Sequence, residues 1–398
     1  MDSGEDLYGE AERAVDTRAD ALWDVALRLH RCPEIAYQEH AAARLLGDEL
    51  RAGGFEVTTG VAGMPTAFVA RGGAASRPGV ALLMEYDALP GLGHACGHNL
   101  IAAAGLGAAL AAREVAGAAG TVLAVGSPAE ESGGGKVALA TAGVFDDVDA
   151  ALMVHPGVRD QTWAPLTAQA QVRVRFYGRS AHPTGNPGEG VDALAALVET
   201  FTMLGALGRR FPPGSHVQGI VTQGGVATNI VPDLAEGLFG CRGLTVDALA
   251  DVIGDVTRSA RAAAAFLGAQ VEVERVGTGY EHFRNSEPLA ARFAQHIRRA
   301  GRVLQEPPAG TFLGSSDIGD VSGRVPAIHP FLAIMDADSS DHTAPFAEAA
   351  ASERGRRAML DGAKALACLA VDTLTSAEVR EEAWRFFHEH EPVAATGR

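Results

Sequence analysis

The stretch GLGHACGHNL, residues 91–100, places two imidazoles and a thiol at alternate positions, at His94, Cys96 and His98. Imidazole and thiolate groups are the ligands that a borderline divalent ion such as zinc takes from proteins. Alternation alone proves little, because side chains two residues apart in an extended segment share one face and could simply meet solvent. A single cysteine such as Cys96 is also more often a small buried residue than a ligand. The stretch is therefore a candidate metal site that needs partners from elsewhere in the chain.

Further groups of suitable chemistry lie at strand ends or in loops. The pair Glu130-Glu131 follows GTVLAVGSPA, His155 follows DDVDAALMV, and His342 lies in DSSDHTAPF. One carboxylate of such a pair can bind a metal while its neighbour takes a proton from an attacking water. Each group has an ordinary alternative, since the pair could be a solvated turn, His155 a structural imidazole and His342 the start of a helix. Their joint placement favours one shared site.

The elements that must position these residues alternate between strand and helix. The apolar run Val80–Met84 indicates a buried strand just before the His/Cys cluster, and the Ala/Leu-rich segment after His98 has helical spacing. Further helices are predicted around Arg18–Leu29 and Glu39–Ala52, and a strand near Ala67–Ala70. In open α/β sheets, ligands bind beyond the carboxyl ends of the strands. We therefore expect the cluster, the glutamate pair and His155 at one edge of an α/β sheet.

From about residue 166 the pattern changes to strands with alternating apolar residues. The order strand, helix, strand, strand, helix, strand up to about residue 282 predicts a compact split α+β module, with its second helix at Val246–Leu267. The pattern of the first part then resumes. We expect a domain made of residues 1–165 and 283–398, interrupted by a second domain at 166–282.

Charge and cysteine content limit the partners and the compartment. The 398-residue chain has a net charge of −16, which opposes binding to nucleic acid or anionic membranes. Its first twenty residues are acidic and lack the apolar segment of a secretory signal, and we expect no stretch long enough to span a membrane. The scattered cysteines fit a reduced compartment better than a disulfide framework. A cytoplasmic protein is expected.

Several stretches resemble, in order and spacing, the dinuclear metallopeptidase family of aminoacylases, carboxypeptidases and auxin-conjugate amidohydrolases. The resemblance covers about residues 20 to 370, and is most specific in three blocks, HACGH, PAEE and GRSAHP. Further matching blocks are YDALPGLG, LMVHPG, GGVATNIVPD, LGSSDIGDVS and DHTAPF. Within the family, the sequence looks most similar to the branch of p-aminobenzoyl-glutamate hydrolase and β-alanyl-lysine dipeptidase-like proteins.

The resemblance implies the fold and the cofactor. The fold would be an α/β catalytic domain with a mixed, mostly parallel sheet flanked by helices, interrupted by a smaller ferredoxin-like α+β lid that also forms a homodimer. The site would hold two divalent metal ions, with zinc expected first and manganese, cobalt or nickel tolerated by the same ligands. The implied ligands are Cys96, His98, Glu131, His155 and His342.

The resemblance also assigns roles beyond the metal ligands. Glu130 matches the general acid/base, and His94 matches no ligand position. His182, in the motif SAHP, matches a lid histidine that reaches the partner subunit's active site, where it would donate to the oxyanion. Asn229 and Arg242 match lid positions associated with the substrate's carboxylate, although Arg242 could also be an ordinary surface charge. Asp87 is placed to orient a ligand histidine.

Two departures from the family pattern bear on substrate preference rather than on metal binding. Many members have an aspartate where this chain has Asn99, which cannot supply the same charge beside the site. Many also have a Ser-Glu-Asp-Phe block where this chain reads SSDI at residues 315–318. Neither change removes a proposed ligand.

The expected function is metal-dependent hydrolysis of an amide bond in a small dipeptide or an N-acyl amino acid, through metal-activated water and Glu130 as base. One alternative is a deacylase of an N-acylated biosynthetic intermediate, with the same chemistry in a different pocket. Another is a catalytically silent metal-binding scaffold, which the presence of Glu130 disfavours because a metal site does not need that carboxylate. A thiol enzyme, with Cys96 as nucleophile and His98 as base, is a further alternative.

Overall fold

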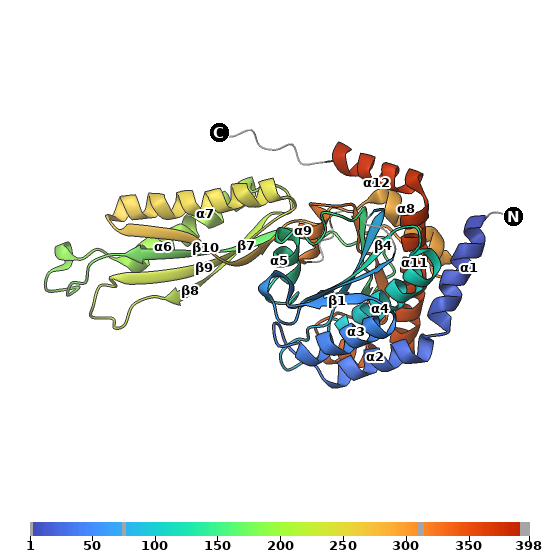
Figure 1. Ribbon diagram of the computed structural model, residues 1–398. Coiled ribbons are helices and arrows are strands. Elements are labelled where there is room, and N and C mark those ends of the chain that lie inside the picture. The colour runs from blue at the N-terminus through green and yellow to red at the C-terminus, as the bar shows by residue number, and fades with distance from the viewer. Residues whose placement is uncertain (1–2, 74–76, 309, 311–313, 391–398) are drawn as a thin grey trace. The chain divides into compact units, whose positions relative to one another are not determined.

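The structure is a computed structural model that describes residues 3–73, 77–308, 310 and 314–390 (Figure 1). The chain forms two units. One unit takes the residues up to Pro165 and most of the chain from Phe283 onward, and the other comprises Leu166–His282 with Gly314 and Ser315.

The first unit contains most of the helices and a six-stranded sheet. Its helices are α1 (Ser3–Asp16), α2 (Ala19–Arg31), α3 (His40–Ala52), α4 (His98–Ala116), α5 (Gly135–Thr141), α8 (Glu287–Arg298), α9 (Ile318–Ser322), α10 (Ala344–Ala349), α11 (Glu353–Thr375) and α12 (Ala377–Glu389). Its strands are β1 (Glu56–Thr59), β2 (Phe68–Gly73), β3 (Gly79–Glu85), β4 (Thr121–Ser127), β5 (Ala150–Leu152), β6 (His155–Gly157), β11 (Ala327–Ile328) and β12 (Phe331–Ala333).

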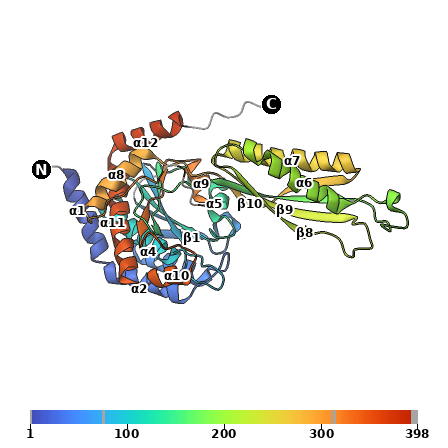
Figure 2. The ribbon, with the colours of Figure 1, turned by 180° about the vertical axis from the view of Figure 1, so that it is seen from behind.

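The sheet has the strand order β1-β2-β4-β3-β5-β11. Strand β3 runs parallel to β4 and β5, and β11 runs parallel to β5, whereas β1 and β2 are antiparallel additions at one edge. All seven residues of β3 are buried, which explains its continuous apolar sequence without alternation. Helices α4 and α11 pack against each other and against β3 (Figure 2). The predicted mixed α/β sheet flanked by helices is confirmed.

Helix α4 corrects one expectation. We expected no stretch long and apolar enough to cross a membrane, but α4 meets that criterion by length and composition. In the structure, 78% of its most apolar window is buried inside the protein. Its alanines and leucines contact α2, α11 and β3, so the apolar sequence serves the packing of a core helix.

The second unit is an antiparallel sheet with two helices. It comprises β7 (Ala168–Tyr177), α6 (Ala193–Leu207), β8 (His216–Gln223), β9 (Leu234–Gly243), α7 (Val246–Leu267) and β10 (Gln270–Tyr280), with strand order β10-β7-β9-β8. Strand β7 alternates buried and more exposed residues, as expected for a sheet with one covered face. Helix α7 has the predicted bounds because Thr245 caps its start and Gly268, in the left-handed conformation, ends it.

Candidate active site

The parallel pairing of β3 with β4 brings the first candidate groups to one edge of the sheet. Each strand ends in a loop, and the two loops carry the His/Cys cluster and the Glu130-Glu131 pair. Gly97 separates Cys96 from His98 and has a φ of +80°, where side chains other than glycine are strained. A Cβ atom there would also lie 2.7 Å from Cγ of Pro156. Glycine therefore lets the start of α4 approach β6, the strand that begins with His155.

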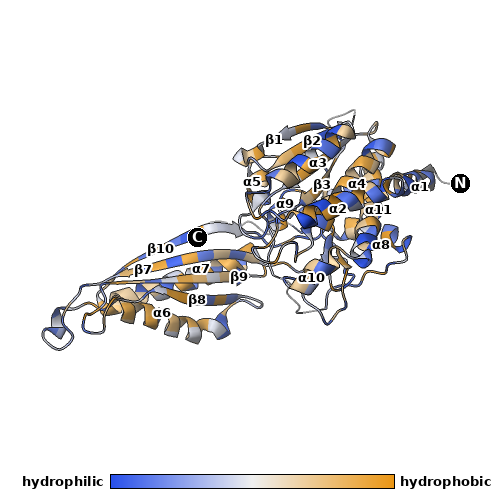
Figure 3. Ribbon diagram, turned by 90° about the horizontal axis from the view of Figure 1, so that it is seen from below, coloured by the Kyte–Doolittle hydropathy of each residue, from blue (hydrophilic) through white to orange (hydrophobic). Residues whose placement is uncertain are grey.

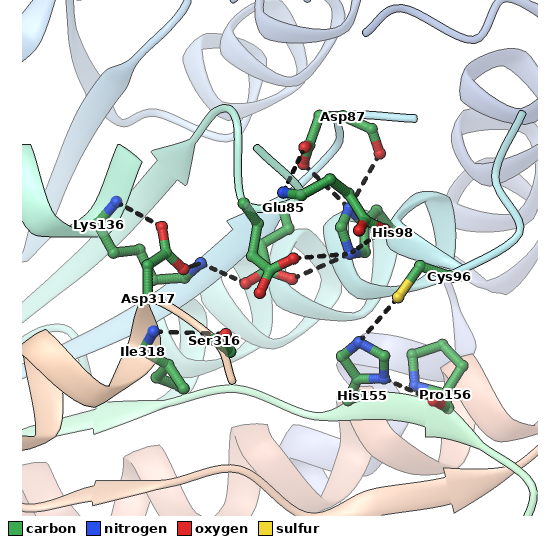
Figure 4. Close-up of polar contacts among 12 residues, drawn as sticks. Glu85, Asp87, Cys96, His98, Lys136, His155, Pro156, Ser316, Asp317 and Ile318 are labelled. Atoms are coloured by element: carbon green, nitrogen blue, oxygen red, sulfur yellow. Dashed lines mark hydrogen bonds and ion pairs between the residues drawn. The ribbon is translucent and has the colours of Figure 1, made fainter. Parts of the chain in front are cut away.

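The structure brings together the five predicted ligands, all within the first unit. Ligand atoms lie within 4.8 Å of one another in three overlapping groups: Cys96, His98 and His155; Cys96, Glu131 and His342; and His98, Glu130 and Glu131. Sγ of Cys96 is 3.5 Å from Nε2 of His155, and Nε2 of His342 is 3.6 Å from Oε1 of Glu131. Figure 4 shows Cys96, His98 and His155 turned toward this cluster.

The hydrogen bonds around the cluster fit a bound cation. Nδ1 of His98 donates to the backbone oxygen of Asp87 at 2.9 Å and to its Oδ1 at 3.0 Å, so Nε2 is the ring nitrogen left for the cluster. Among the residues that the structure describes, neither this buried Nε2 nor the buried Oε1 of Glu131 has a hydrogen-bond partner. Nitrogen and oxygen atoms that converge in the interior and can bind a cation in place of a proton are suited to a metal ion.

Burial and neighbouring charges set the protonation of the cluster. Burial would lower the pKa of His98, but Cys96 and Asp87 raise it well above its ordinary value. Burial lowers the pKa of His155 to about 4, so this imidazole is neutral at pH 7, as a ligand must be. Burial also raises the pKa of the Cys96 thiol well above its usual range. A thiolate there would require a cation beside it, and the raised pKa disfavours Cys96 as a nucleophile on its own.

Glu130 has the environment of a general acid/base. Its pKa is raised well above the ordinary value, mainly by burial and then by the nearby carboxylates of Glu85 and Asp317. A carboxyl group with a raised pKa exchanges protons more readily near neutral pH than an ordinary one. The side chain is 12% exposed, which leaves it accessible at the edge of the cluster.

Asp87, and not Asn99, accounts for the orientation of the histidine ligand. Besides accepting from His98, Asp87 accepts a hydrogen bond from the backbone nitrogen of Glu131 at 3.0 Å, so one carboxylate fixes two predicted ligands. Asn99 points elsewhere. Its Nδ2 donates to the backbone oxygens of Ala350 at 3.1 Å and Ala26 at 3.3 Å, tying α4 to neighbouring segments.

The sequence did not reveal a buried charged group beside the site, made of Glu85, Lys136 and Asp317. Nζ of Lys136 forms an ion pair with Glu85 and lies 2.6 Å from Oδ1 of Asp317 (Figure 4). Although burial alone would raise the pKa of Glu85, attraction to Lys136 and then to His98 lowers it to about 2. The sequence did contain a signal for this charged group. The chain is rich in arginine and has two lysines, Lys136 and Lys364, and Glu85 is a charged residue at the end of an apolar strand.

His329 is a second residue that the sequence did not reveal. Its ring is 1% exposed, and its centroid lies 5.4 Å from that of His155. Neither ring nitrogen has a hydrogen-bond partner within the described part of the chain. Phe331 stacks on both imidazoles, so His329 helps to pack the ring of a predicted ligand.

The predicted lid residues all belong to the second unit. Nδ1 of His182 accepts a hydrogen bond from the backbone nitrogen of Gly185 at 3.0 Å, and the side chain is exposed. Arg242, on β9, donates from Nη1 to Oγ of Ser315 at 2.6 Å. Asn229 is exposed in the loop before β9. Because these three residues lie in the second unit and the metal cluster lies in the first, their part in the site stays a prediction.

Comparison with known proteins identifies the class. Residues 81–371 match Peptidase family M20/M25/M40, and the chain belongs to this family. The mouse protein Xaa-Arg dipeptidase is 35% identical over 92% of this chain and 89% of its own length. One of the p-aminobenzoyl-glutamate hydrolase subunits of Escherichia coli is 29% identical over 98% of this chain and 96% of its own length.

Solved structures share the fold. A putative aminohydrolase from methicillin-resistant Staphylococcus aureus has a TM-score of 0.79 at 20% identity, covering 92% of this chain and all of the other. The YXEP protein of Bacillus subtilis, described as a dinuclear metal-binding peptidase of the M20 family, has a TM-score of 0.70 at 22% identity, covering 90% and 99%. The predicted family is confirmed. The chain is a metallo-amidohydrolase that uses divalent metal ions to hydrolyse an amide bond in a small substrate.

Proposed function

We propose that the protein is a zinc-dependent dipeptidase or aminoacylase whose substrate is a dipeptide or an N-acyl amino acid with a free carboxylate. The observation that carries the proposal is the convergence of sulfur, imidazole and carboxylate ligand atoms in overlapping groups of three, each within 4.8 Å, beside Glu130. The ligands are Cys96, His98, Glu131, His155 and His342. The mixture of sulfur, nitrogen and oxygen donors suits zinc better than magnesium or calcium.

Different residues of the chain carry out different parts of the hydrolysis. When bound, the divalent ions polarise the amide carbonyl and acidify the attacking water. Glu130 accepts the proton of that water on its carboxylate and later delivers it to the leaving nitrogen, because an amide nitrogen is a poor leaving group without a proton. Asp87 keeps the imidazole of His98 in the tautomer whose Nε2 faces the cluster.

The second unit supplies the proposed contacts to the substrate. His182 donates to the oxyanion of the tetrahedral intermediate, a contribution of about 3–4 kcal/mol for a preorganised donor. Arg242 and Asn229 bind the substrate's carboxylate. The guanidinium of Arg242 already donates to a neutral oxygen, Oγ of Ser315, and a carboxylate is the stronger acceptor for the remaining N–H groups.

A substrate panel with a matched variant tests the proposal. Zinc-loaded protein is assayed with Xaa-Arg and β-alanyl dipeptides, N-acyl amino acids and p-aminobenzoyl-glutamate, and turnover of at least one of them is expected. Glu130→Gln should retain the bound zinc and lose about 10²–10⁴-fold in kcat. If every panel member is inert, or if wild type and Glu130→Gln turn over equally, the hydrolase mechanism is wrong. An N-acylated biosynthetic intermediate as the preferred substrate would instead support the deacylase alternative.

We also propose a homodimer formed through the second unit. Strand β8 lies at the edge of its sheet and exposes Ile220 and Val221, at 57% and 49%, and the neighbouring α6 exposes Val198 at 50%. Helix α6 is hydrophobic along much of its length (Figure 3). An exposed apolar strand edge is readily covered by the same strand of a second copy.

Light scattering on the purified protein should give the mass of a dimer, and Ile220→Asp should shift it toward the monomer. A shared active site makes a further prediction, that mixed His182→Ala and Glu130→Gln subunits regain activity that neither has alone. A monomeric wild type would contradict the dimer, and no recovery in a mixed dimer would contradict the shared site.

The cytoplasm is the proposed compartment. All four cysteines are free thiols, among them the exposed Cys32 and the predicted ligand Cys96, which fits a reducing environment. Fractionation of the producing cells tests this, since recovery of the protein outside the cytoplasm would contradict it.

A further inference from the structure

Glu85 stands closer to the histidine ligand than either member of the glutamate pair does. It is the last residue of β3 and is 1% exposed. Its Oε2 lies 3.5 Å from Nε2 of His98, whereas carboxylate oxygens of Glu130 and Glu131 lie 3.9 Å away. Three carboxylates therefore surround one imidazole nitrogen in the interior of the first unit.

The approach of Glu85 to His98 places a buried carboxylate oxygen against an imidazole nitrogen. Nδ1 of His98 donates to Asp87, so the ring nitrogen that Oε2 of Glu85 approaches is Nε2, which can bind either a proton or a metal ion. Neither atom has a hydrogen-bond partner in the part of the chain that is described. A carboxylate oxygen and an imidazole nitrogen that approach each other in the interior need a cation between them, which is a proton when no metal is bound and can be the metal ion when one is.

Lys136 does not act as that cation. Its ammonium lies on the other side of the carboxylate, where it pairs with Oε1 of Glu85 and with Asp317. The backbone nitrogen of Lys136 also donates to Oδ2 of Asp317 at 2.8 Å, which fixes the position of Asp317. The result is a carboxylate held at one oxygen by Lys136, with its second oxygen directed at His98.

The distance matches two ligands of one metal ion. Zinc binds nitrogen and carboxylate oxygen at about 2.0–2.2 Å, and two ligand atoms of a tetrahedral site are then about 3.4 Å apart. The separation between Nε2 of His98 and Oε2 of Glu85 is 3.5 Å, close to the 3.6 Å between the predicted ligands His342 and Glu131.

We propose that Glu85 is a further ligand of the metal ion held by His98, and that Lys136 and Asp317 position its carboxylate. The inference rests on the metal site of the proposed function and adds a ligand to it. With Glu85 beside His98, the metal does not need Glu130, whose carboxylate stays available to carry the proton.

Cobalt is the probe for the test, because the visible spectrum of bound Co²⁺ reports the ligand set as well as occupancy. Metal-free Glu85→Gln is titrated with Co²⁺ and compared with wild type. In Glu85→Gln we expect one of the two Co²⁺ ions to bind at least about 100-fold more weakly than in wild type. This loss is larger than the usual effect of a residue that only positions a ligand. The visible absorption bands of bound cobalt should change as well.

The matched control is Asp372→Asn. Asp372 is also a buried carboxylate beside a histidine, 2.7 Å from Nε2 of His296, and lies outside the cluster, so its removal should leave cobalt binding unchanged.

Unchanged cobalt affinity and an unchanged spectrum in Glu85→Gln would overturn the inference. A loss of about 10-fold in cobalt affinity with an unchanged spectrum would also overturn it, because that result is typical of a residue that positions a ligand without binding the metal. If Glu85→Gln does not fold, Glu85→Asp keeps the charge but withdraws the carboxylate by one methylene, and the same loss of cobalt affinity is expected. A wild type that takes up no cobalt would overturn the proposed function itself, whereas failure confined to the Glu85 variants overturns only the added ligand.

Discussion

At the scale of single residues, the orientation of imidazoles and carboxylates decides whether a cluster can bind metal. Asp87 shows this most clearly, because its two oxygens fix the ring of His98 and the backbone of Glu131 at the same time. Sequence reasoning could identify metal-binding residue types from local motifs. It could not identify Glu85 or Asp317, because their approach to His98 and Lys136 depends on chain segments that meet only in the fold.

Replacing Asp87 by asparagine should weaken metal binding by about 10–100-fold without unfolding the protein. The asparagine side chain lacks the charge that holds the N–H of His98, and its amide can turn a donor toward the ring. Affinity is measured by competition with a chelator of known strength. Asp149→Asn is the control, since Asp149 binds the backbone of Gly79 at the opposite end of β3. Equal metal affinity in Asp87→Asn and wild type would contradict the orienting role.

At the scale of elements, the site depends on how closely α4 approaches β6. The sequence predicts α4, β3 and β4 because long apolar or alanine-rich runs between glycines indicate buried elements. The sequence did not predict α1. Its buried residues Ala11, Ala14 and Val15 are few in an acidic segment, and they are buried because α1 packs on α11 and α4. The sequence also did not predict that one apolar run divides into β5 and β6. Periodicity does not show that the first half pairs with β11 and the second with β12.

Gly97→Ala tests the approach of α4 to β6. The substitution should lower the free energy of unfolding by about 1–3 kcal/mol through the left-handed backbone conformation alone, and the overlap with Pro156 adds to it. Metal affinity should fall as well, since Cys96 and His98 flank the position. Denaturant titrations of the metal-free protein and cobalt titrations measure the two effects.

Gly91→Ala is the matched control, because Gly91 also has a positive φ, of +73°, but its Cβ would meet no described atom within 4 Å. The expected difference between the two variants is the cost of the contact with Pro156. If Gly97→Ala is no worse than Gly91→Ala in both stability and cobalt affinity, the close approach is not important.

At the scale of the whole molecule, folding buries His94 in the neutral form, which makes stability depend on pH. Burial, with smaller contributions from His98 and His30, lowers the pKa of His94 to about 3. An unfolded histidine has a pKa of about 6.5, so between these values the unfolded chain binds more protons than the native protein. The contribution of His94 to the free energy of unfolding should therefore decrease as the pH falls below about 6.5.

For His94 alone, this linkage amounts to about 2 kcal/mol at pH 5 relative to neutral pH. Urea titrations of the metal-free protein at pH 7 and pH 5 measure the total decrease. His94→Gln, which cannot titrate, should reduce the decrease by about that amount. An identical pH dependence in the variant and in wild type would show that His94 is not buried in the neutral form.

The central claim is that the converging ligands of the first unit hold two divalent ions that hydrolysis requires. It is tested most directly by adding zinc in known amounts to chelated protein while measuring both bound metal and hydrolysis of the best substrate in the panel. Activity should be absent without metal and should rise to a plateau at two bound ions per chain. Full activity in protein shown to carry no metal would contradict the claim.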